Sequence, residues 1–264
     1  MSERAPPTAD EADYLLRTKG WVLFPGQLTE AQVAALSADS DRVYDLCREV
    51  QVTNGVAGNM EGAAHHVAGF GGALDQFLED FPLNAEIERF FEGKYIVLNY
   101  GAALNPPGTR SYTFKPHRDI RHFSPGFRLS LNMLVLLSEF NETTGGTLML
   151  SGSHQVEAMP PPGFFEAHAE GIVGKAGDIV LFDSHLVHSA APNRSNDRRR
   201  ALTLCLGRPF MKPQMDWPRY LTPEVQARLT PAMKQLLGFN ARVAASLDEY
   251  YQPEERWTFR ADQR

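Results

Sequence analysis

The sequence feature that most constrains this fold is a change of apolar period near Lys94. From there to about residue 210, short runs rich in branched and aromatic residues recur, separated by turns containing glycine and proline. Many short strands joined by such turns predict an antiparallel sandwich or barrel rather than parallel βαβ units. The strand candidates are residues 95–100, 112–115, 129–137, 147–150, 179–182 and 201–206.

Helical patterns lie on both sides of this strand-rich region. A short helix is predicted over residues 10–19, followed by a strand at residues 21–24. Thr29 and Gln32 form a capping-box pattern, which predicts the start of a longer helix. Further short helices are expected between residues 74 and 93, and helical spacing returns after residue 210.

These patterns predict a mainly β chain with flanking helices, of the α+β class. The 264 residues, 43% of them hydrophobic, suit one large domain or two small ones, and the continuous run of strands favours a single domain over residues 1–264. Its expected parts are a flexible tail at 1–9, an N-terminal helical scaffold and lid at 10–92, a β core at 93–210 and a C-terminal helical segment at 211–264.

Residues 54–72 differ in character from the helices around them. They contain six glycines and the adjacent pair His65 and His66, without helical or strand periodicity. A long loop of this kind is often a lid or a binding loop, and it can equally be a mobile surface connection. The two histidines could therefore contact a substrate or simply face solvent.

Composition and charge limit the classes of partner. The formal net charge of −6 gives no basic footprint for nucleic acid. Cys47 and Cys205 lie far apart in apolar surroundings, which predicts free thiols in a reducing compartment. With no apolar run near the ~20 residues needed to span a bilayer, we expect a cytoplasmic protein acting on a small molecule. Aromatic residues in the C-terminal segment are consistent with a homodimer contact or with ordinary packing.

A candidate metal site follows the second strand candidate. His117 and Asp119 are two residues apart, so both side chains point to one side if the strand continues to them. His188, just beyond the strand at 179–182, could complete the set from a distant strand. Two histidines and one carboxylate leave open coordination positions, the arrangement of non-haem Fe(II) oxygenases. A structural zinc site would be closed, usually by four ligands that often include cysteines.

A candidate anion site lies at the start of the last strand. Strand alternation places Arg199 on the same face as the small residues Ala201, Thr203 and Cys205. A guanidinium heading such a face could bind a carboxylate through two parallel hydrogen bonds. Part of the run at residues 198–200 is equally explained as a solvated charge cluster.

The chain resembles the phytanoyl-CoA dioxygenase family of Fe(II)/2-oxoglutarate-dependent oxygenases. The similarity covers roughly residues 10–210, and the ordered set of motifs is more specific than the His-x-Asp triplet alone. The matching pieces are His117-Arg118-Asp119, the TGGTLMLSGSH stretch at 144–154, GDIVLF at 177–182, HSAAPNRS at 188–195 and Arg199-Arg200.

This resemblance implies a fold and a set of ligands. The fold is a double-stranded β-helix, a jelly roll related to the cupins. The cofactor and co-substrates are Fe(II), 2-oxoglutarate and O2, with His117, Asp119 and His188 as the iron ligands. Arg199 would hold the far carboxylate of 2-oxoglutarate, with Arg200 as the neighbouring alternative.

Two further polar residues are weaker candidates for cofactor binding. Thr113 shares the strand parity of His117 and would face the metal if the strand runs unbroken through Pro116. Asn99, on the preceding strand, could reach the co-substrate or the substrate. Both are equally consistent with ordinary positions in a sheet.

The resulting functional hypothesis is hydroxylation of an unactivated C–H bond in a small metabolite or natural-product intermediate, with release of succinate and CO2. Desaturation and cyclisation are open alternatives within the same class. A metal-dependent hydrolase could use the same three ligands, but it leaves Arg199 unexplained. A non-catalytic, cupin-like binding module is a third possibility. Binding of 2-oxoglutarate that depends on Arg199 would separate the oxygenase from both rivals.

Overall fold

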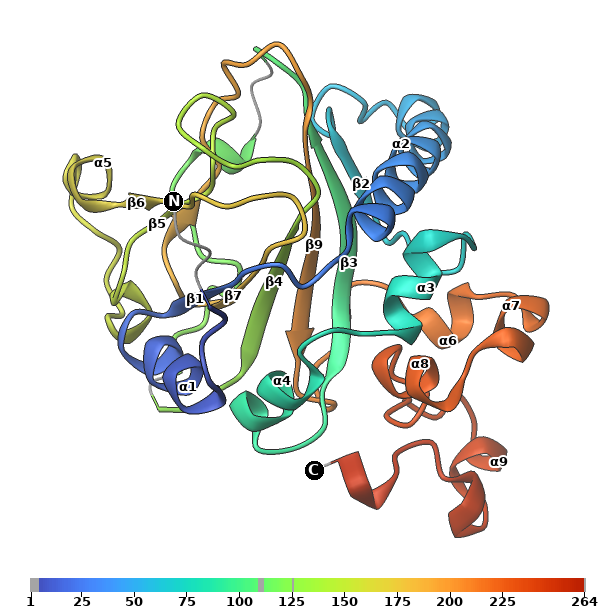
Figure 1. The fold of residues 1–264 in the computed structure, drawn as a ribbon. Helices are drawn as coiled ribbons and strands as arrows, with labels where there is room; N and C mark the ends of the chain where they lie inside the picture. Colours follow the sequence, from blue (N-terminus) through green and yellow to red (C-terminus); the bar gives the residue numbers. More distant parts are fainter. Residues whose placement is uncertain (1–4, 109–111, 125, 264) are drawn as a thin grey trace.

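The computed structural model describes residues 5–108, 112–124 and 126–263. Within these ranges the strands form a six-stranded sheet of order β1-β7-β4-β9-β3-β2 and a three-stranded sheet of order β6-β5-β8 (Figure 1). All the strand pairs are antiparallel. The strands are β1 (Trp21–Phe24), β2 (Ala63–His65), β3 (Ile96–Asn105), β4 (Ser130–Leu136), β5 (Leu148–Met149), β6 (Glu170–Gly171), β7 (Ile179–Asp183), β8 (His188–Ser189) and β9 (Arg199–Gly207).

Most helices form where the capping patterns predict them. The side chain of Thr29 accepts a hydrogen bond from the Gln32 amide, and the Gln32 side chain accepts one from the Thr29 amide. The helices are α1 (Ala9–Thr18), α2 (Glu30–Thr53), α3 (Ala73–Glu79), α4 (Asn84–Phe91), α5 (Phe164–His168), α6 (Trp217–Tyr220), α7 (Pro223–Arg228), α8 (Pro231–Leu236) and α9 (Leu247–Tyr250). None of the described helices is both long and apolar enough to cross a membrane.

The two faces of the large sheet have different partners. Leu202, Leu204 and Leu206 of β9 belong to a core cluster that also contains α-helical residues such as Phe77 and Trp217. In Figure 1, α2, α3 and the C-terminal helices lie to one side of this sheet, and the small sheet lies to the other. Burying each leucine stabilises the fold by roughly 1.5–3 kcal/mol, so the even-numbered face of β9 is fixed against the helices.

The opposite, inner face of the large sheet meets the small sheet. A second core cluster joins Leu134, Phe182 and Ala201 of the large sheet with Met149 of β5 and with Ile172. The odd-numbered residues of β9, including Arg199, share this inner face. The alternation expected from the sequence therefore determines which β9 side chains enter the space between the sheets.

The expected strand at 112–115 is wrong. Residues Tyr112–Phe114 form the 3₁₀ turn η1, and Pro116 has no N–H to donate to a strand ladder. After the proline, pairing is limited to an isolated bridge between His117 and His188. Thr113 therefore lies in a turn, and the parity argument that aimed it at the metal loses its basis.

The glycine-containing segment at 54–72 is not a free loop throughout. Its centre forms β2, which pairs with β3 so that His65 is opposite Gly101 and Ala63 is opposite Ala103. The expected lid is thus an edge strand at its middle. Sequence reasoning missed β2 because three residues are too few to display a period.

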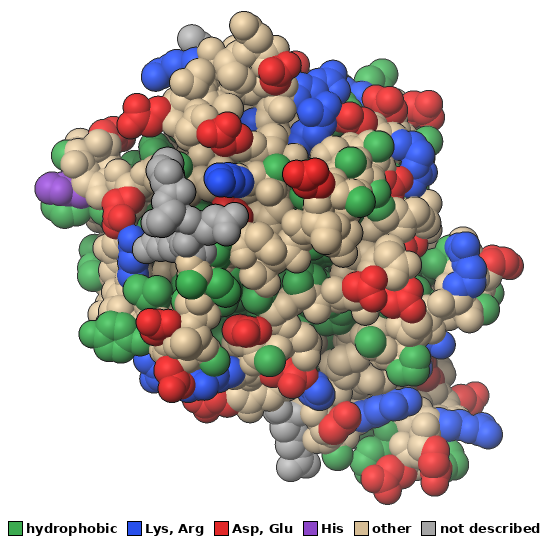
Figure 2. All heavy atoms as spheres, viewed as in Figure 1, with side chains coloured by type: hydrophobic (Ala, Val, Ile, Leu, Met, Phe, Trp, Pro, Cys, Tyr) green, Lys and Arg blue, Asp and Glu red, His purple; other side chains and the backbone are tan. Residues whose placement is uncertain are grey.

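Charge is mixed on the surface. On the face shown in Figure 2, acidic and basic side chains are interspersed rather than gathered by sign. This face therefore offers no continuous basic track of the kind that binds a nucleic-acid backbone.

Candidate active site

The three candidate metal ligands are brought together by backbone pairing. The main-chain N–H of His117 donates to the His188 carbonyl at 3.0 Å, and the His188 N–H donates to the His117 carbonyl at 3.0 Å. The Asp119 N–H donates to the Ser184 carbonyl at 3.2 Å, at the end of β7. This short stretch of pairing holds a loop segment from early in the β core against the strand that precedes His188.

The side chains of His117, Asp119 and His188 form what we call the His-Asp-His cluster. One ligand atom from each lies within 4.8 Å of the others, and no second group of this kind occurs among the described residues. His117 Nε2 is 3.5 Å from Asp119 Oδ1, and His188 Nε2 is 3.7 Å from Asp119 Oδ2. The donor set of two imidazoles and one carboxylate could hold one metal ion with open positions.

The main chain selects the tautomer of both histidines. Nδ1 of His117 is 2.8 Å from the Lys115 carbonyl, and Nδ1 of His188 is 2.9 Å from the Leu186 carbonyl. A carbonyl can only accept a hydrogen bond, so each Nδ1 carries the hydrogen. Both Nε2 lone pairs are therefore directed into the cluster, ready to bind a cation.

Asp119 is oriented by a residue that sequence reasoning missed. The side-chain amide of Asn132, on β4, donates to Asp119 Oδ2 at 2.6 Å. This contact restrains the carboxylate relative to the two histidines. The available signal was a single buried amide between Leu131 and Met133 in an otherwise apolar strand.

The electrostatic environment affects the three cluster residues differently. A hydrogen bond to Asp119 raises the pKa of His117, whereas burial lowers the pKa of His188 and favours its neutral form. Burial raises the pKa of Asp119, but the hydrogen bond from His117, the neighbouring imidazoles and the Asn132 amide outweigh it. The net pKa of Asp119 lies below its usual range, so the carboxylate is ionised at neutral pH.

Arg199 is a buried cation on the inner face of the large sheet. Its side chain lies over the Phe140 ring, with 4.6 Å from the guanidinium carbon to the ring centroid, and the residue is 7% exposed. Its Nη1 atom is buried and has no hydrogen-bond partner among the described residues. Burial lowers the pKa of Arg199 to about 10, so the group is still charged at neutral pH. An unpaired buried guanidinium fits an anionic ligand.

The neighbouring arginine is already paired. Arg200 points to the helical side, where its Nη2 is 3.0 Å from Asp41 Oδ2 and its Nε is 3.2 Å from Asp41 Oδ1. Arg198 Nη1 also approaches Asp41, at 3.7 Å. Of the arginines at the start of β9, the geometry therefore favours Arg199 as the anion-binding residue.

The two weaker sequence candidates lie in different surroundings. Asn99 of β3 is opposite Cys205, which is opposite Asn132, so Asn99 shares the inner face with the cluster. Its Oδ1 atom is buried without a hydrogen-bond partner among the described residues. Thr113 lies in η1, where its carbonyl accepts a hydrogen bond from the Ala190 N–H at 2.9 Å.

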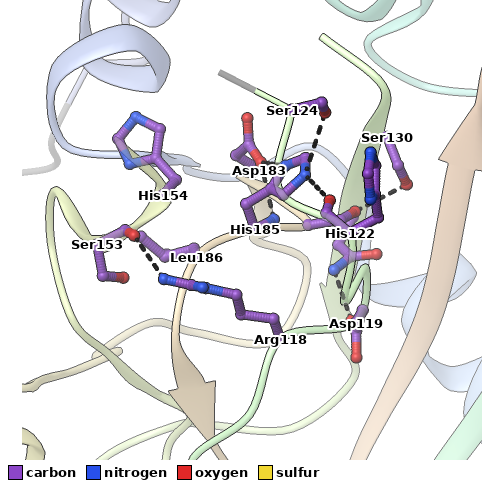
Figure 3. Close-up of polar contacts among 12 residues, drawn as sticks. Arg118, Asp119, His122, Ser124, Ser130, Ser153, His154, Asp183, His185 and Leu186 are labelled. Carbon is purple, nitrogen blue, oxygen red and sulfur yellow. Dashed lines mark hydrogen bonds and ion pairs between the residues drawn. The ribbon is translucent and has the colours of Figure 1, made fainter. Parts of the chain in front are cut away.

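Arg118, between two cluster residues, holds the segment beyond β5. Figure 3 shows its side chain extending toward Ser153, in a different direction from Asp119. The guanidinium donates to the carbonyls of Ser153 at 3.1 Å and Glu157 at 2.6 Å, and also to that of Val156. No sequence pattern indicated this role, because the partners of Arg118 are main-chain atoms.

The chain has relatives among known proteins. The chain is 35% identical over 147 residues to an uncharacterised protein of Mycobacterium tuberculosis, covering 56% of this chain and 54% of that protein. The chain thus spans about half the length of the curated relatives it matches.

The fold is also found in solved structures. HygX from Streptomyces hygroscopicus, solved with nickel and 2-oxoglutarate bound, matches with a TM-score of 0.59 and 13% identity over 79% of this chain and 90% of that one. SnoK, a non-haem α-ketoglutarate-dependent carbocyclase from nogalamycin biosynthesis, matches with a TM-score of 0.57 and 19% identity over 87% and 95%. These likenesses confirm the predicted fold class.

The sequence matches a known family as well. The profile of the phytanoyl-CoA dioxygenase family matches residues 16–201, which is more than half of the chain. The resemblance seen in the sequence motifs is thereby confirmed. The protein therefore belongs to the phytanoyl-CoA dioxygenase family.

Proposed function

We propose that this protein is an Fe(II)/2-oxoglutarate-dependent dioxygenase that hydroxylates an unactivated C–H bond of a small metabolite or natural-product intermediate, releasing succinate and CO2. The observation that carries the proposal is the buried, unpaired guanidinium of Arg199 on the inner face of the large sheet, the face whose Asn132 contacts the His-Asp-His cluster. A metal site alone suits many reactions, whereas a metal site beside a buried anion site suits a carboxylate-bearing co-substrate.

His117, Asp119 and His188 would hold the Fe(II), which when bound supplies the redox chemistry of O2 activation. The Nδ1 hydrogen bonds of both histidines keep their Nε2 atoms facing the ion. Asn132 keeps the Asp119 carboxylate from rotating away. These contacts pre-organise the ligands, so little rearrangement is needed on metal binding.

Arg199 would bind the far carboxylate of 2-oxoglutarate. The Phe140 ring packs on its guanidinium and restricts the side chain, while the surrounding apolar residues exclude water. In that environment a charge-assisted, two-pronged hydrogen bond to a carboxylate is strong. Thr113 remains a cofactor contact only as a prediction from the sequence, because it lies in a turn and no longer follows strand parity. Asn99, predicted to reach the co-substrate or the substrate, lies on the inner face of the sheet with Asn132.

The rival functions explain less of the site. A metal-dependent hydrolase would use the same cluster but has no need of a buried cation at Arg199. A cupin-like binding module without activity would not require both histidine tautomers to be selected. Desaturation and cyclisation would use the same metal and co-substrate sites as hydroxylation.

The proposal is tested by succinate release from 2-oxoglutarate in air with added Fe(II). We expect slow turnover by the wild type even without its substrate, and its loss in Asp119→Ala and Arg199→Ala. Arg200→Ala is the matched control, because Arg200 is the same residue type one position along the strand and pairs with Asp41 instead. Succinate release by the wild type that survives in Asp119→Ala would contradict the proposed metal site.

A further inference from the structure

The inner face of the large sheet carries a second set of polar side chains beside the cluster. Directly opposed residues of antiparallel strands point to the same face. Asn99 of β3 is opposite Cys205 of β9, and Cys205 is opposite Asn132 of β4. Asn132 in turn contacts Asp119. This line of residues therefore faces the His-Asp-His cluster.

The next row of opposed residues along these strands includes a residue of the edge strand β2. His65 of β2 is opposite Gly101 of β3, and Gly101 is opposite Thr203 of β9. Thr203 and Cys205 are two positions apart along β9, so the two lines of residues are roughly 7 Å apart. His65 and Thr203 thus share the inner face with Asn99.

Gly101 allows these two polar side chains to approach the same point of the strand. A Cβ atom added there would lie 3.3 Å from Thr203 Oγ1 and 3.4 Å from His65 Nδ1, as well as 2.8 Å from the Ala64 carbonyl oxygen, so a larger residue would crowd all three. We call the surface formed by Gly101, His65 and Thr203 the Gly101 cradle.

The polar groups around the cradle lack hydrogen-bond partners among the described residues. Across the described ranges, neither His65 nor Thr203 makes a side-chain hydrogen bond, and Asn99 Oδ1 is buried without one. His65, Asn99 and Thr203 are all only partly exposed. Half-buried donors and acceptors without partners are costly unless a ligand or water completes them.

We propose that His65, Asn99 and Thr203 bind the prime substrate through an uncharged hydroxyl or carbonyl group seated at the Gly101 cradle. That the ligand is the substrate rests on the proposed dioxygenase function. The three side chains determine specificity, because they contact the substrate at a distance from the carbon that reacts.

The chemistry of the cradle selects an uncharged group. An amide and a hydroxyl both donate and accept hydrogen bonds without carrying charge. Burial lowers the pKa of His65, which favours the neutral imidazole.

The position of the cradle also sets the size of the substrate. Asn99 and Asn132 are separated by β9, so their strands are roughly 10 Å apart. A group anchored near Asn99 must therefore be joined to the reacting carbon by several bonds. This excludes substrates of only two or three carbons.

The test is binding of matched probes to the full-length protein loaded with Zn(II) and 2-oxoglutarate, and to the metal-free protein. The probes are two pairs: cyclohexylmethanol with cyclohexanecarboxylate, and phenylethanol with phenylacetate. Isotope-labelled histidine side chains are followed by NMR, and the His65 signal is assigned by its loss in His65→Asn. We expect the alcohols, and not the carboxylates, to shift the His65 signal.

The variants separate a binding role from a structural one. Thr203→Val keeps the side-chain shape and should weaken alcohol binding about fivefold, the loss of one hydrogen bond. His66→Asn is the matched control, because the His66 ring packs against Trp217 instead, with centroids 5.6 Å apart. It should leave binding unchanged.

Three results would overturn the inference. They are no alcohol-induced shift of the His65 signal, equal alcohol binding by Thr203→Val and wild type, or carboxylates binding at His65 as well as alcohols. Alcohol binding that persists in a protein unable to bind metal or 2-oxoglutarate would support the cradle while refuting the proposed function. Failure of the proposed substrate site and failure of the proposed dioxygenase function therefore give different results.

Discussion

At the scale of single residues, the orientation of Asp119 depends on the amide of Asn132. The two side chains are joined by a 2.6 Å hydrogen bond from β4. Asn132→Leu keeps the volume but removes the donor, so the carboxylate can rotate away from the histidines. We expect metal affinity to fall about tenfold, as is typical when a partner of a metal ligand is removed.

Anaerobic calorimetric titration with Fe(II) measures this effect. The control is Asn84→Leu, which removes an amide that accepts a hydrogen bond from the Tyr95 hydroxyl at 2.7 Å, far from the cluster along the chain. Equal Fe(II) affinities for Asn132→Leu and wild type would show that Asp119 needs no such restraint.

A second residue-scale prediction concerns His185. Its Nδ1 is 2.9 Å from Asp183 Oδ1 and its Nε2 is 2.9 Å from the His122 carbonyl (Figure 3). Both partners accept hydrogen bonds, and a doubly protonated ring donates to both; the Ser124 hydroxyl also lies 3.4 Å from Nε2. The hydrogen bond to Asp183, opposed by burial, raises the pKa of His185 above its ordinary value of 6.5.

The sign of the resulting pH dependence follows from linkage. A pKa raised in the folded state stabilises the protein fully below about pH 6.5, and this stabilisation is lost as pH rises through the folded-state pKa. His185→Gln should therefore lower the free energy of unfolding more at about pH 6 than at about pH 9. Urea unfolding of both proteins at the two pH values measures the difference, and a larger effect at the higher pH would refute the assignment.

Some site residues were predictable from the sequence and others were not. His117, Asp119 and His188 carried a recognisable spacing, and strand alternation separated Arg199 from Arg200. Asn132 acts through a partner thirteen positions away, which no local pattern reveals. Side chains that orient ligands are in general set by tertiary contact rather than by spacing.

At the scale of elements, Arg118 joins the cluster segment to the turn η2 (Ser153–Gln155) and the residues after it. Its guanidinium donates to main-chain carbonyls of Ser153 and Glu157, among others. Arg118→Ala should lower the free energy of unfolding by about 1.5 kcal/mol. It should also speed hydrogen exchange of the amides at residues 153–158, as mass spectrometry of peptides would detect.

Arg121→Ala is the control for that prediction. Arg121 lies three residues further along the same segment and is exposed. The same charge is removed there without loss of the carbonyl contacts. If both variants exchange at the wild-type rate, Arg118 is not a structural clamp.

Element prediction succeeded where a local chemical signal exists. Capping residues such as Thr29 marked the helices, and runs of alternating residues marked β4, β7 and β9. It failed for β2, β6 and β8, which have two or three residues and exist only through pairing. It also failed at η1, where Pro116 prevents the strand from continuing.

At the scale of the whole molecule, the two faces of the large sheet have different roles. Its outer face packs on the helices and supplies the larger core cluster, while its inner face carries Arg199, the Gly101 cradle and Asn132, which contacts the His-Asp-His cluster. Family and fold were predictable from the sequence because the ordered motifs fix both. The residues that contact the substrate became visible only when β2 was placed beside β3.

The central claim is that one metal ion and one 2-oxoglutarate share the inner face of the sheet, and anaerobic calorimetry tests it most directly. We predict that 2-oxoglutarate binds the wild type in the presence of Fe(II), much more weakly without it, and at least tenfold more weakly to Arg199→Ala than to Arg200→Ala. Binding that is independent of Fe(II), or that is equally strong in both arginine variants, would contradict the claim.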